Sequence, residues 1–304
     1  MIVKNKTVKA QQPLLPTEPY AAFYNLTFGY QHDATIPSPY GYTIKLSEPN
    51  GDAVERFREQ FRLANRTKPI ACSSIQYDGV LLTRRLSEVY VQCPQCSHNQ
   101  EAMAILRSSS QCMRKCSRKP IELTVERPAK HIPVDVYGKC GALKCSFLKN
   151  HNCLQMLSND YRFYLALENN VCTSYITEKL WRQAYQPGLI PIVLKDSLVR
   201  PFLPPNSYLA ADNFTSPKAL ADHVRSLMDD DDTYVRYFNW KRQYAVVFLD
   251  GIRHDHFERP WGVCRLCELL HEQPRKTRNV HGFRDWLIGP DVCDNSLVNR
   301  LLLK

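Results

Sequence analysis

Residues 161–194 have the pattern of a complete strand, helix and strand. Two unbroken apolar runs of strand length, 163–167 and 189–194, suit parallel strands that are covered on both faces. Between them, Thr177 is placed to cap a helix, and a Pro-Gly pair supplies its end. Apolar residues recur at four-residue spacing along this helix: Ile176, Leu180 and Ala184. The segment therefore predicts an α/β fold with a parallel sheet.

Polar side chains gather where these elements meet. Glu168 and Asn169 follow the first strand, while Glu178 and Lys179 open the helix. Open α/β sheets bind ligands at strand ends and helix N-termini, where free N–H groups and the helix dipole favour anions. A nucleotide diphosphate fits this place, with Lys179 near the phosphates and Tyr175 and Glu178 near sugar hydroxyls. An ordinary core with a solvated Glu178 and Lys179 has the same spacing, so the pattern alone leaves both interpretations open.

Residues 168–181 read E-N-x(2)-C-x(2)-Y-I-T-E-K-L-W, which closely resembles the donor-binding signature of the α1,3-fucosyltransferases. The resemblance implies a fold of two Rossmann-like α/β domains that face a cleft, the GT-B type of glycosyltransferase. It implies GDP-fucose as the donor and no required cofactor. It places donor contacts at Asn169, Tyr175, Glu178 and Lys179, with Lys179 as the main partner of the pyrophosphate.

The similarity continues through the second half of the chain. Near the C-terminus, Cys264 and Cys267 form a C-x-x-C that resembles the closing disulfide element of the family, followed by His271 and Trp286. The other similar segments are 204–208, 214–221 and 237–241 and, less strongly, 24–30 and 39–41.

Three parts of the chain follow from this interpretation. Residues 1–19 are polar and contain several prolines, which predicts a flexible N-terminal segment that leads into the fold. Residues 20–130 form the acceptor-side domain, which is atypical and rich in cysteine from 76 to 130. Residues 131–304 form the GDP-fucose donor-binding domain, which opens with a strand around Val134.

Two amphipathic helices have clear limits. The first begins at Asp52 and ends near Asn65, and the second begins at Ser216. Their expected buried positions are Val54, Phe57 and Phe61, then Leu220, Val224 and Leu227. The acidic run 229–232 predicts a solvated loop, because four consecutive carboxylates cannot all converge on one ion. No metal is expected, since a helix N-terminus and basic side chains can hold a diphosphate.

The segment 76–130 departs from the family pattern. The family resemblance leads us to expect an arginine that meets the donor phosphates here, but Arg84, Arg85, Arg107 and Arg127 are equivalent candidates and none is assigned. Four cysteines in this segment have a spacing close to that of structural zinc ribbons: Cys93, Cys96, Cys112 and Cys116. Two disulfides in an oxidising compartment, or irregular structure, are the favoured alternatives to zinc.

Charge and cysteine content limit the cellular setting. The net charge of +10 is spread over scattered Lys and Arg residues without a nucleic-acid-binding motif, so nucleic acid is not an expected partner. Twelve cysteines, together with sequons at Asn5, Asn25, Asn65 and Asn213, indicate a secretory lumen. No apolar stretch is long enough to span a bilayer. The family resemblance implies a type II protein on the lumenal side of the Golgi membrane, held by an anchor that this chain does not contain.

The resulting hypothesis is transfer of fucose from GDP-fucose to a hydroxyl of a glycan or glycoprotein, with inversion. The catalytic base is unassigned, because the glutamate of the family's E-S-P segment has no counterpart before Tyr24. We therefore expect donor binding with slow transfer, unless Glu48 or Asp33 serves as the base. The alternatives are a catalytically impaired relative that binds the donor, and a zinc-stabilised interaction protein.

Overall fold

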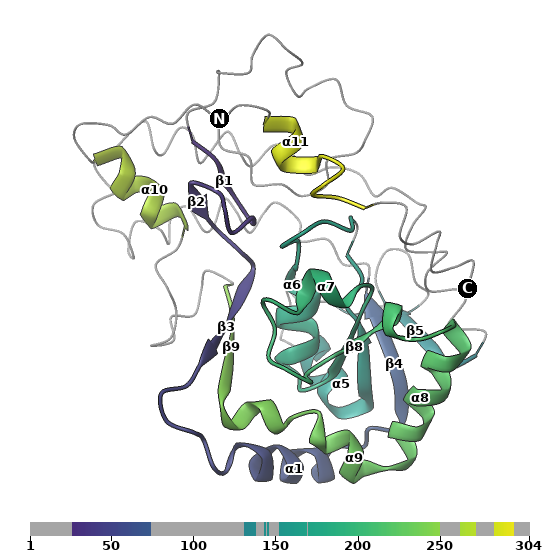
Figure 1. The fold of residues 1–304 in the computed structure, drawn as a ribbon. Helices are drawn as coiled ribbons and strands as arrows, with labels where there is room; N and C mark the ends of the chain where they lie inside the picture. Colours follow the sequence, from purple (N-terminus) through teal and green to yellow (C-terminus); the bar gives the residue numbers. More distant parts are fainter. Residues whose placement is uncertain are drawn as a thin grey trace.

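The computed structural model describes residues 26–73, 131–137, 143, 145, 152–168, 170–249, 262–271 and 283–294 of the 304-residue chain. Its centre is a five-stranded sheet in which all paired strands are parallel and the order is β5-β4-β6-β7-β8 (Figure 1). The strands are β4 Lys68–Ser73, β5 Val134–Tyr137, β6 Tyr161–Leu165, β7 Ile190–Val193 and β8 Leu209–Ala210. The order reverses between β4 and β6, and in open α/β sheets ligands bind at the carboxyl end of the strands at such a reversal.

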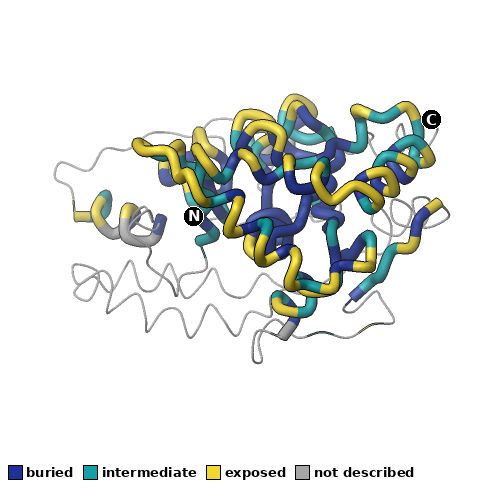
Figure 2. Tube along the Cα trace, turned by 90° about the horizontal axis from the view of Figure 1, so that it is seen from below, coloured by how far each residue is buried: buried dark blue, intermediate teal, exposed yellow. Residues whose placement is uncertain are grey.

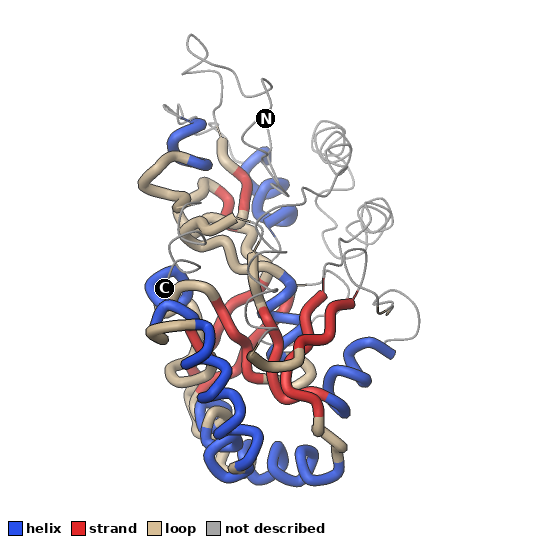
Figure 3. The backbone as a smooth tube through the Cα atoms, turned by 90° about the vertical axis from the view of Figure 1, so that its right-hand side faces the viewer, coloured by secondary structure: helices blue, strands red, loops and turns tan. Residues whose placement is uncertain are grey.

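Helices cover both faces of this sheet (Figure 3). One face packs on α1 Ala53–Leu63, α8 Pro217–Asp229 and α9 Asp231–Arg236. The other packs on α5 Asn152–Asp160, α6 Glu178–Leu180, the π-helix η3 Trp181–Tyr185 and α7 Asp196–Val199. Alternate strand residues serve the two faces, so Phe163 joins the first core and Tyr164 the second. Figure 2 shows the buried residues gathered in the middle of the described chain.

The strand–helix–strand prediction for 161–194 is confirmed, with β6 starting two residues before the apolar run. The helix begins after Thr177 as expected, but it becomes π-helical at Trp181, which no feature of the sequence indicated. Gly188 ends the turn with a φ of 74°, a conformation that glycine adopts without strain. The buried Arg66 donates hydrogen bonds to the carbonyls of Gly188, at 2.6 Å, and Pro187, at 3.2 Å.

The predictions for the two amphipathic helices and for the strand at Val134 are also confirmed. Helix α1 ends at Leu63, and helix α8 begins after Ser216, whose side chain accepts a hydrogen bond from the amide of Ala219 at 3.1 Å. Ala221 is buried as well, and all six of the expected positions are buried: Val54, Phe57, Phe61, Leu220, Val224 and Leu227.

The predicted domain boundary at residue 130 is not where the sheet divides. Strand β4, which was assigned to the acceptor side, pairs with β5 and β6 of the donor side. Helix α1 joins the same core, since the rings of Phe57 and Phe238 stack at 3.8 Å. The long segment 74–130 separates β4 from its partner strand β5 in sequence, so local patterns do not indicate their pairing.

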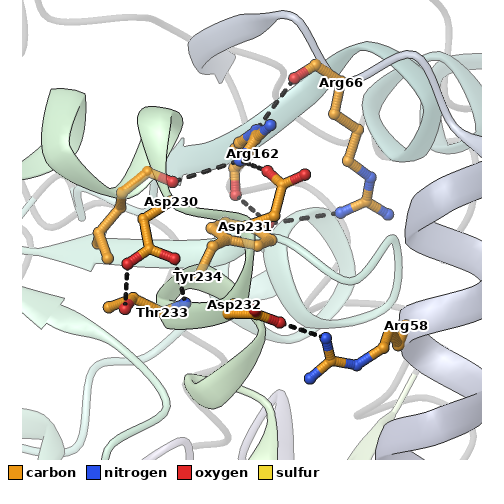
Figure 4. Close-up of polar contacts among 9 residues, drawn as sticks. Arg58, Arg66, Arg162, Asp230, Asp231, Asp232, Thr233 and Tyr234 are labelled. Carbon is orange, nitrogen blue, oxygen red and sulfur yellow. Dashed lines mark hydrogen bonds and ion pairs between the residues drawn. The ribbon is translucent and has the colours of Figure 1, made fainter.

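The acidic run after α8 is not a loop. Asp230 caps α9 by accepting the amide N–H of Thr233 at 2.9 Å, and Asp231 forms an ion pair with Arg162 at 2.6 Å (Figure 4). Asp232 pairs with Arg58 of α1. The carboxylates stay exposed, at 65% for Asp231 and 71% for Asp232, and they hold α9 against β6 and α1.

Strands β1 and β2 and helices α10 and α11 lie beyond the carboxyl ends of the sheet, and the β3–β9 pair lies beside it (Figure 1). Strand β1 Phe28–Gly29 pairs in parallel with β2 Ile36–Pro37, so the strand expected over 24–30 is shorter where the structure describes it. Helix α10 Gly262–His271 packs Leu266 on Phe28 and Ile36, and α11 Phe283–Ile288 follows. A ribbon of β3 Gly41–Lys45 and β9 Tyr244–Phe248, antiparallel, links this part to α1 and η5 Asn239–Arg242.

The α/β class with a parallel sheet is thus confirmed. In the described part of the chain, the only sheets besides the central one are the β1–β2 and β3–β9 pairs. The expected lead 1–19, the four cysteines of the zinc-like spacing and the four candidate arginines all lie outside the described residues, as do the side chains of Cys264 and Cys267. No described helix has the length and hydropathy of a membrane span.

Candidate functional site

The predicted donor motif lies in the loop between β6 and α6, at the carboxyl end of the sheet. A pocket opens there over the ends of β6 and β7, enclosing about 420 Å³ including space open to solvent. Its walls are mostly aliphatic, with one carboxylate and one ammonium group among them. The lining residues that carry polar groups are Glu168, Asn170, Tyr175 and Lys195.

Glu168 is the centre of a buried polar network in this loop. Its carboxylate accepts hydrogen bonds from the Thr177 amide N–H at 2.7 Å and from the Thr177 hydroxyl at 2.8 Å. It also accepts one from the Lys179 ammonium group at 2.9 Å, and Lys179 donates a further one to the Thr177 hydroxyl at 3.1 Å. The loop after β6 is therefore closed onto the start of α6 by charge-assisted hydrogen bonds, which are stronger than neutral ones.

Burial governs the protonation of this pair. The side chains of Glu168 and Lys179 are 13% and 11% exposed. Burial raises the pKa of Glu168, and the positive charge of Lys179 only partly offsets this. Burial acts to lower the pKa of Lys179, but the carboxylates of Glu168 and Glu178 outweigh it and raise that pKa well above its usual range. Lys179 therefore keeps its positive charge throughout the neutral range.

Glu178 adds a second buried carboxylate beside the pair. The residue is 5% exposed, and its negative charge acts on both members of the pair, raising the pKa values of Glu168 and Lys179. A hydrogen bond from a ligand hydroxyl to a carboxylate in such a buried place is stronger than one at an exposed site.

Three tyrosines close the other side of this cluster. The rings of Tyr30 and Tyr175 meet edge to face at 4.8 Å. Burial, with a smaller contribution from Asp33, raises the pKa of Tyr30 to about 12. Burial also raises the pKa values of Tyr175 and Tyr40 above their usual range. All three phenols are therefore protonated at neutral pH and present hydrogen-bond donors beside the carboxylates.

The segment after α11 is fastened to the motif loop. Cys172 and Cys293 form a disulfide and a β-bridge, so residues that are 121 apart in sequence lie side by side. Two backbone hydrogen bonds flank the bridge: Thr173 donates to Val292 at 2.8 Å, and Asp294 donates to Val171 at 2.7 Å. A second disulfide joins Cys145 to Cys153. Cys172 itself lines the pocket, so the disulfide fixes one of its walls.

The N-terminal segment reaches the same place through α11. Gln31 donates a hydrogen bond to the Trp286 carbonyl at 2.7 Å, and the Trp286 indole donates to Asp33 at 2.9 Å. Asp33, one of the two carboxylates considered as a base, thus lies near Tyr30. Glu48 lies in the exposed connection between β3 and α1, away from the pocket.

The structure brings together Tyr175, Glu178 and Lys179, and Asn169 lies outside the described residues. Tyr175 lines the pocket, whereas Glu178 and Lys179 are buried next to it. Sequence reasoning missed Glu168 as the partner of Lys179, although it is the first residue of the motif. It also missed Lys195, which carries no motif signal, because only the fold places it on the pocket.

A parallel sheet with charged and phenolic groups at its carboxyl end, next to a reversal of strand order, has the arrangement in which open α/β proteins bind ligands. The model of the family described as "Glycosyltransferase family 10 (fucosyltransferase) C-term" matches residues 98–286. The chain belongs to this family, and the resemblance seen in residues 168–181 is confirmed.

Individual relatives agree with this assignment. Alpha-(1,3)-fucosyltransferase fut-1 of Caenorhabditis elegans is 36% identical over 261 residues, which are 85% of this chain and 50% of that protein. Glycoprotein 3-alpha-L-fucosyltransferase A of Drosophila melanogaster is 40% identical over 168 residues, 54% of this chain and 31% of that protein. The chain thus spans about half or less of the length of these relatives. A crystal structure of an alpha1,3-fucosyltransferase with GDP-fucose aligns with a TM-score of 0.39 and 18% identity, covering 63% of this chain and 55% of that one.

Proposed function

We propose that this chain binds GDP-fucose at the pocket beyond β6 and β7 and transfers fucose to a hydroxyl of a glycan, with α1,3 specificity and inversion. The observation that carries the proposal is the buried cluster of Glu168, Glu178, Lys179 and Tyr175 at the carboxyl end of a parallel sheet, inside a motif of the fucosyltransferase family. No cofactor is included in the proposal. The acceptor is a glycan or glycoprotein.

The described residues divide the tasks of such a transfer. A single displacement needs stabilisation of the leaving diphosphate and a base for the acceptor hydroxyl. An ammonium group has three N–H donors, and Lys179 uses two of them on Glu168 and Thr177, which leaves one for a ligand. Glu178 and the phenol of Tyr175 supply an acceptor and a donor for hydroxyls of the sugar. The base remains unassigned, with Asp33 better placed than Glu48.

Calorimetric titration and product analysis test this function together. We expect the chain to bind GDP-fucose and GDP, and to convert a glycan acceptor to a product heavier by one fucose, measured by mass spectrometry. The matched control is the Glu178→Gln variant, which keeps the size of the side chain and loses its charge. Binding of GDP without any transfer or donor hydrolysis would indicate a catalytically impaired relative, and absence of both activities would contradict the proposal.

We also propose a lumenal location in the Golgi apparatus, with membrane association. The support is the disulfides, which persist in oxidising compartments, and two exposed sequons. Asn65 lies in the connection between α1 and β4, and Asn213 ends the 3-10 helix η4 Ala211–Asn213 after β8. In both sequons the threonine is exposed as well, which leaves the acceptor site open to the glycosylating enzyme.

In protein made through a secretory route, Asn65 and Asn213 are expected to carry N-glycans. Enzymatic release in heavy-oxygen water followed by peptide mass spectrometry should convert both asparagines to labelled aspartate. Thr67→Ala and Thr215→Ala should each remove one site. The exposed Asn206, which is not in a sequon, is the internal control and should stay unlabelled. Unmodified peptides at both sequons would remove this support for a lumenal location.

A further inference from the structure

The pocket contains a lysine that the donor motif does not include. Lys195 lies two residues after the end of β7 and lines the same pocket as Glu168 and Tyr175. It is half-buried, and it is the one basic residue among the described residues that line the pocket. Its place is set by the fold, because β7 ends beside β6 at the edge where ligands bind.

Two carboxylates close to Lys195 in the chain or in the fold are already engaged with other partners. Asp196, the next residue, forms an ion pair with Arg200 and accepts a hydrogen bond from the Tyr208 hydroxyl at 2.7 Å. Asp212 accepts the amide N–H of Asp196 at 2.9 Å. Within the part of the chain that the structure describes, the Lys195 ammonium group forms neither an ion pair nor a hydrogen bond.

The Lys179 ammonium group, in contrast to that of Lys195, is already paired with a carboxylate. Its ammonium group is held by Glu168 at 2.9 Å and lies near the second carboxylate, Glu178. The two carboxylates and the Lys179 ammonium group together carry an excess negative charge, which repels a diphosphate. Adding the Lys195 charge makes the described part of the site neutral. The positive charge of Lys195 therefore favours the binding of an anionic ligand at this site, although Lys195 is not part of the motif.

We propose that Lys195 binds a phosphate group of the nucleoside diphosphate in addition to Lys179, which also holds the motif loop through Glu168. This rests on the proposed function, since it names a residue that takes the phosphates of that donor. A compact ammonium group on a flexible stem binds phosphate as a point charge, and since Lys195 has no partner among the described residues, these leave all three of its N–H donors to the ligand.

The test separates phosphate binding from the shape of the pocket. Titrations of GDP, guanosine and inorganic diphosphate are compared for the wild type, Lys195→Ala and Lys195→Arg. We expect Lys195→Ala to weaken GDP and diphosphate binding by about ten-fold or more and to leave guanosine unchanged. Lys195→Arg, which keeps the charge, should restore most of the affinity. The exposed Lys45, at the end of β3, provides the control variant Lys45→Ala, which should bind all three ligands as the wild type does.

Each alternative result of these titrations would contradict a different part of the proposals. GDP affinity that Lys195→Ala leaves unchanged, or equal losses for GDP and guanosine, would contradict phosphate binding by Lys195. A wild-type chain that does not bind GDP would overturn the proposed function. In that case, loss of inorganic diphosphate binding in Lys195→Ala would still support Lys195 as an anion-binding residue, and no diphosphate binding by the wild type would overturn both.

Discussion

Replacing Lys179 with alanine is expected to lower the free energy of unfolding by about 3–5 kcal/mol, because it leaves the Glu168 carboxylate buried without its ionic partner. The two Thr177 hydrogen bonds remain, but they are neutral donors and do not balance the charge. Urea unfolding monitored by tryptophan fluorescence measures the loss. In the same variant, GDP affinity should fall by ten-fold or more, either through a lost phosphate contact or through disorder of the loop.

A double mutant separates the contribution of the ion pair to stability from the cost of leaving one of its two charges unpaired. Glu168→Gln combined with Lys179→Met removes both charges and keeps similar volumes, so most of the lost stability should return. GDP binding by this double mutant then shows whether Lys179 contacts the ligand or only positions the loop. If Lys179→Ala is as stable as the wild type, the ion pair does not exist in solution and the arrangement of the site is wrong.

Removing the Cys172–Cys293 disulfide is expected to have an effect of similar size. In the chain-entropy treatment, a cross-link between residues 121 apart stabilises the folded state by about 5 kcal/mol. Replacing both cysteines with serine should lower the melting temperature and also weaken GDP binding, because Cys172 is part of the pocket wall.

The second disulfide provides the matched control. Cys145 and Cys153 are 8 residues apart, for which the same treatment gives about 2.5 kcal/mol. Serine at both positions should therefore cost roughly half as much stability and, since neither cysteine lines the pocket, leave GDP affinity near that of the wild type. Equal losses of GDP affinity in the two double-serine variants would show that the Cys172–Cys293 link has no special role at the site.

Much of the donor side was predictable because its signals are local. Apolar runs, caps and a Pro-Gly stop fix β6, β7 and the helix between them, and Ser216 marks the start of α8. The family resemblance then identified Tyr175, Glu178 and Lys179 as a group. These predictions needed only neighbouring residues, which is the range over which propensity and periodicity act.

The parts that failed depend on contacts between distant residues. Nothing near Lys68 indicates that β4 pairs with a strand beyond residue 130, and nothing near Asp231 indicates the ion pair with Arg162 that helps to hold α9 on the sheet. The pairing of Glu168 with Lys179 was within reach, since both belong to one motif. The place of Lys195 on the pocket was not, because it follows from which strands are neighbours.

The β3–β9 ribbon has a consequence for how this protein is made. Strand β3 is synthesised well before its partner at Tyr244–Phe248, which follows the whole central sheet, and Cys172 precedes Cys293 by 121 residues. The nascent chain therefore carries an unpaired strand until β9 has been made and an unpaired thiol until Cys293 has been made. The edge of such a strand is open to association with other chains until its partner arrives. Closure of the ribbon and oxidation of Cys172 thus come after all five strands of the central sheet have been synthesised.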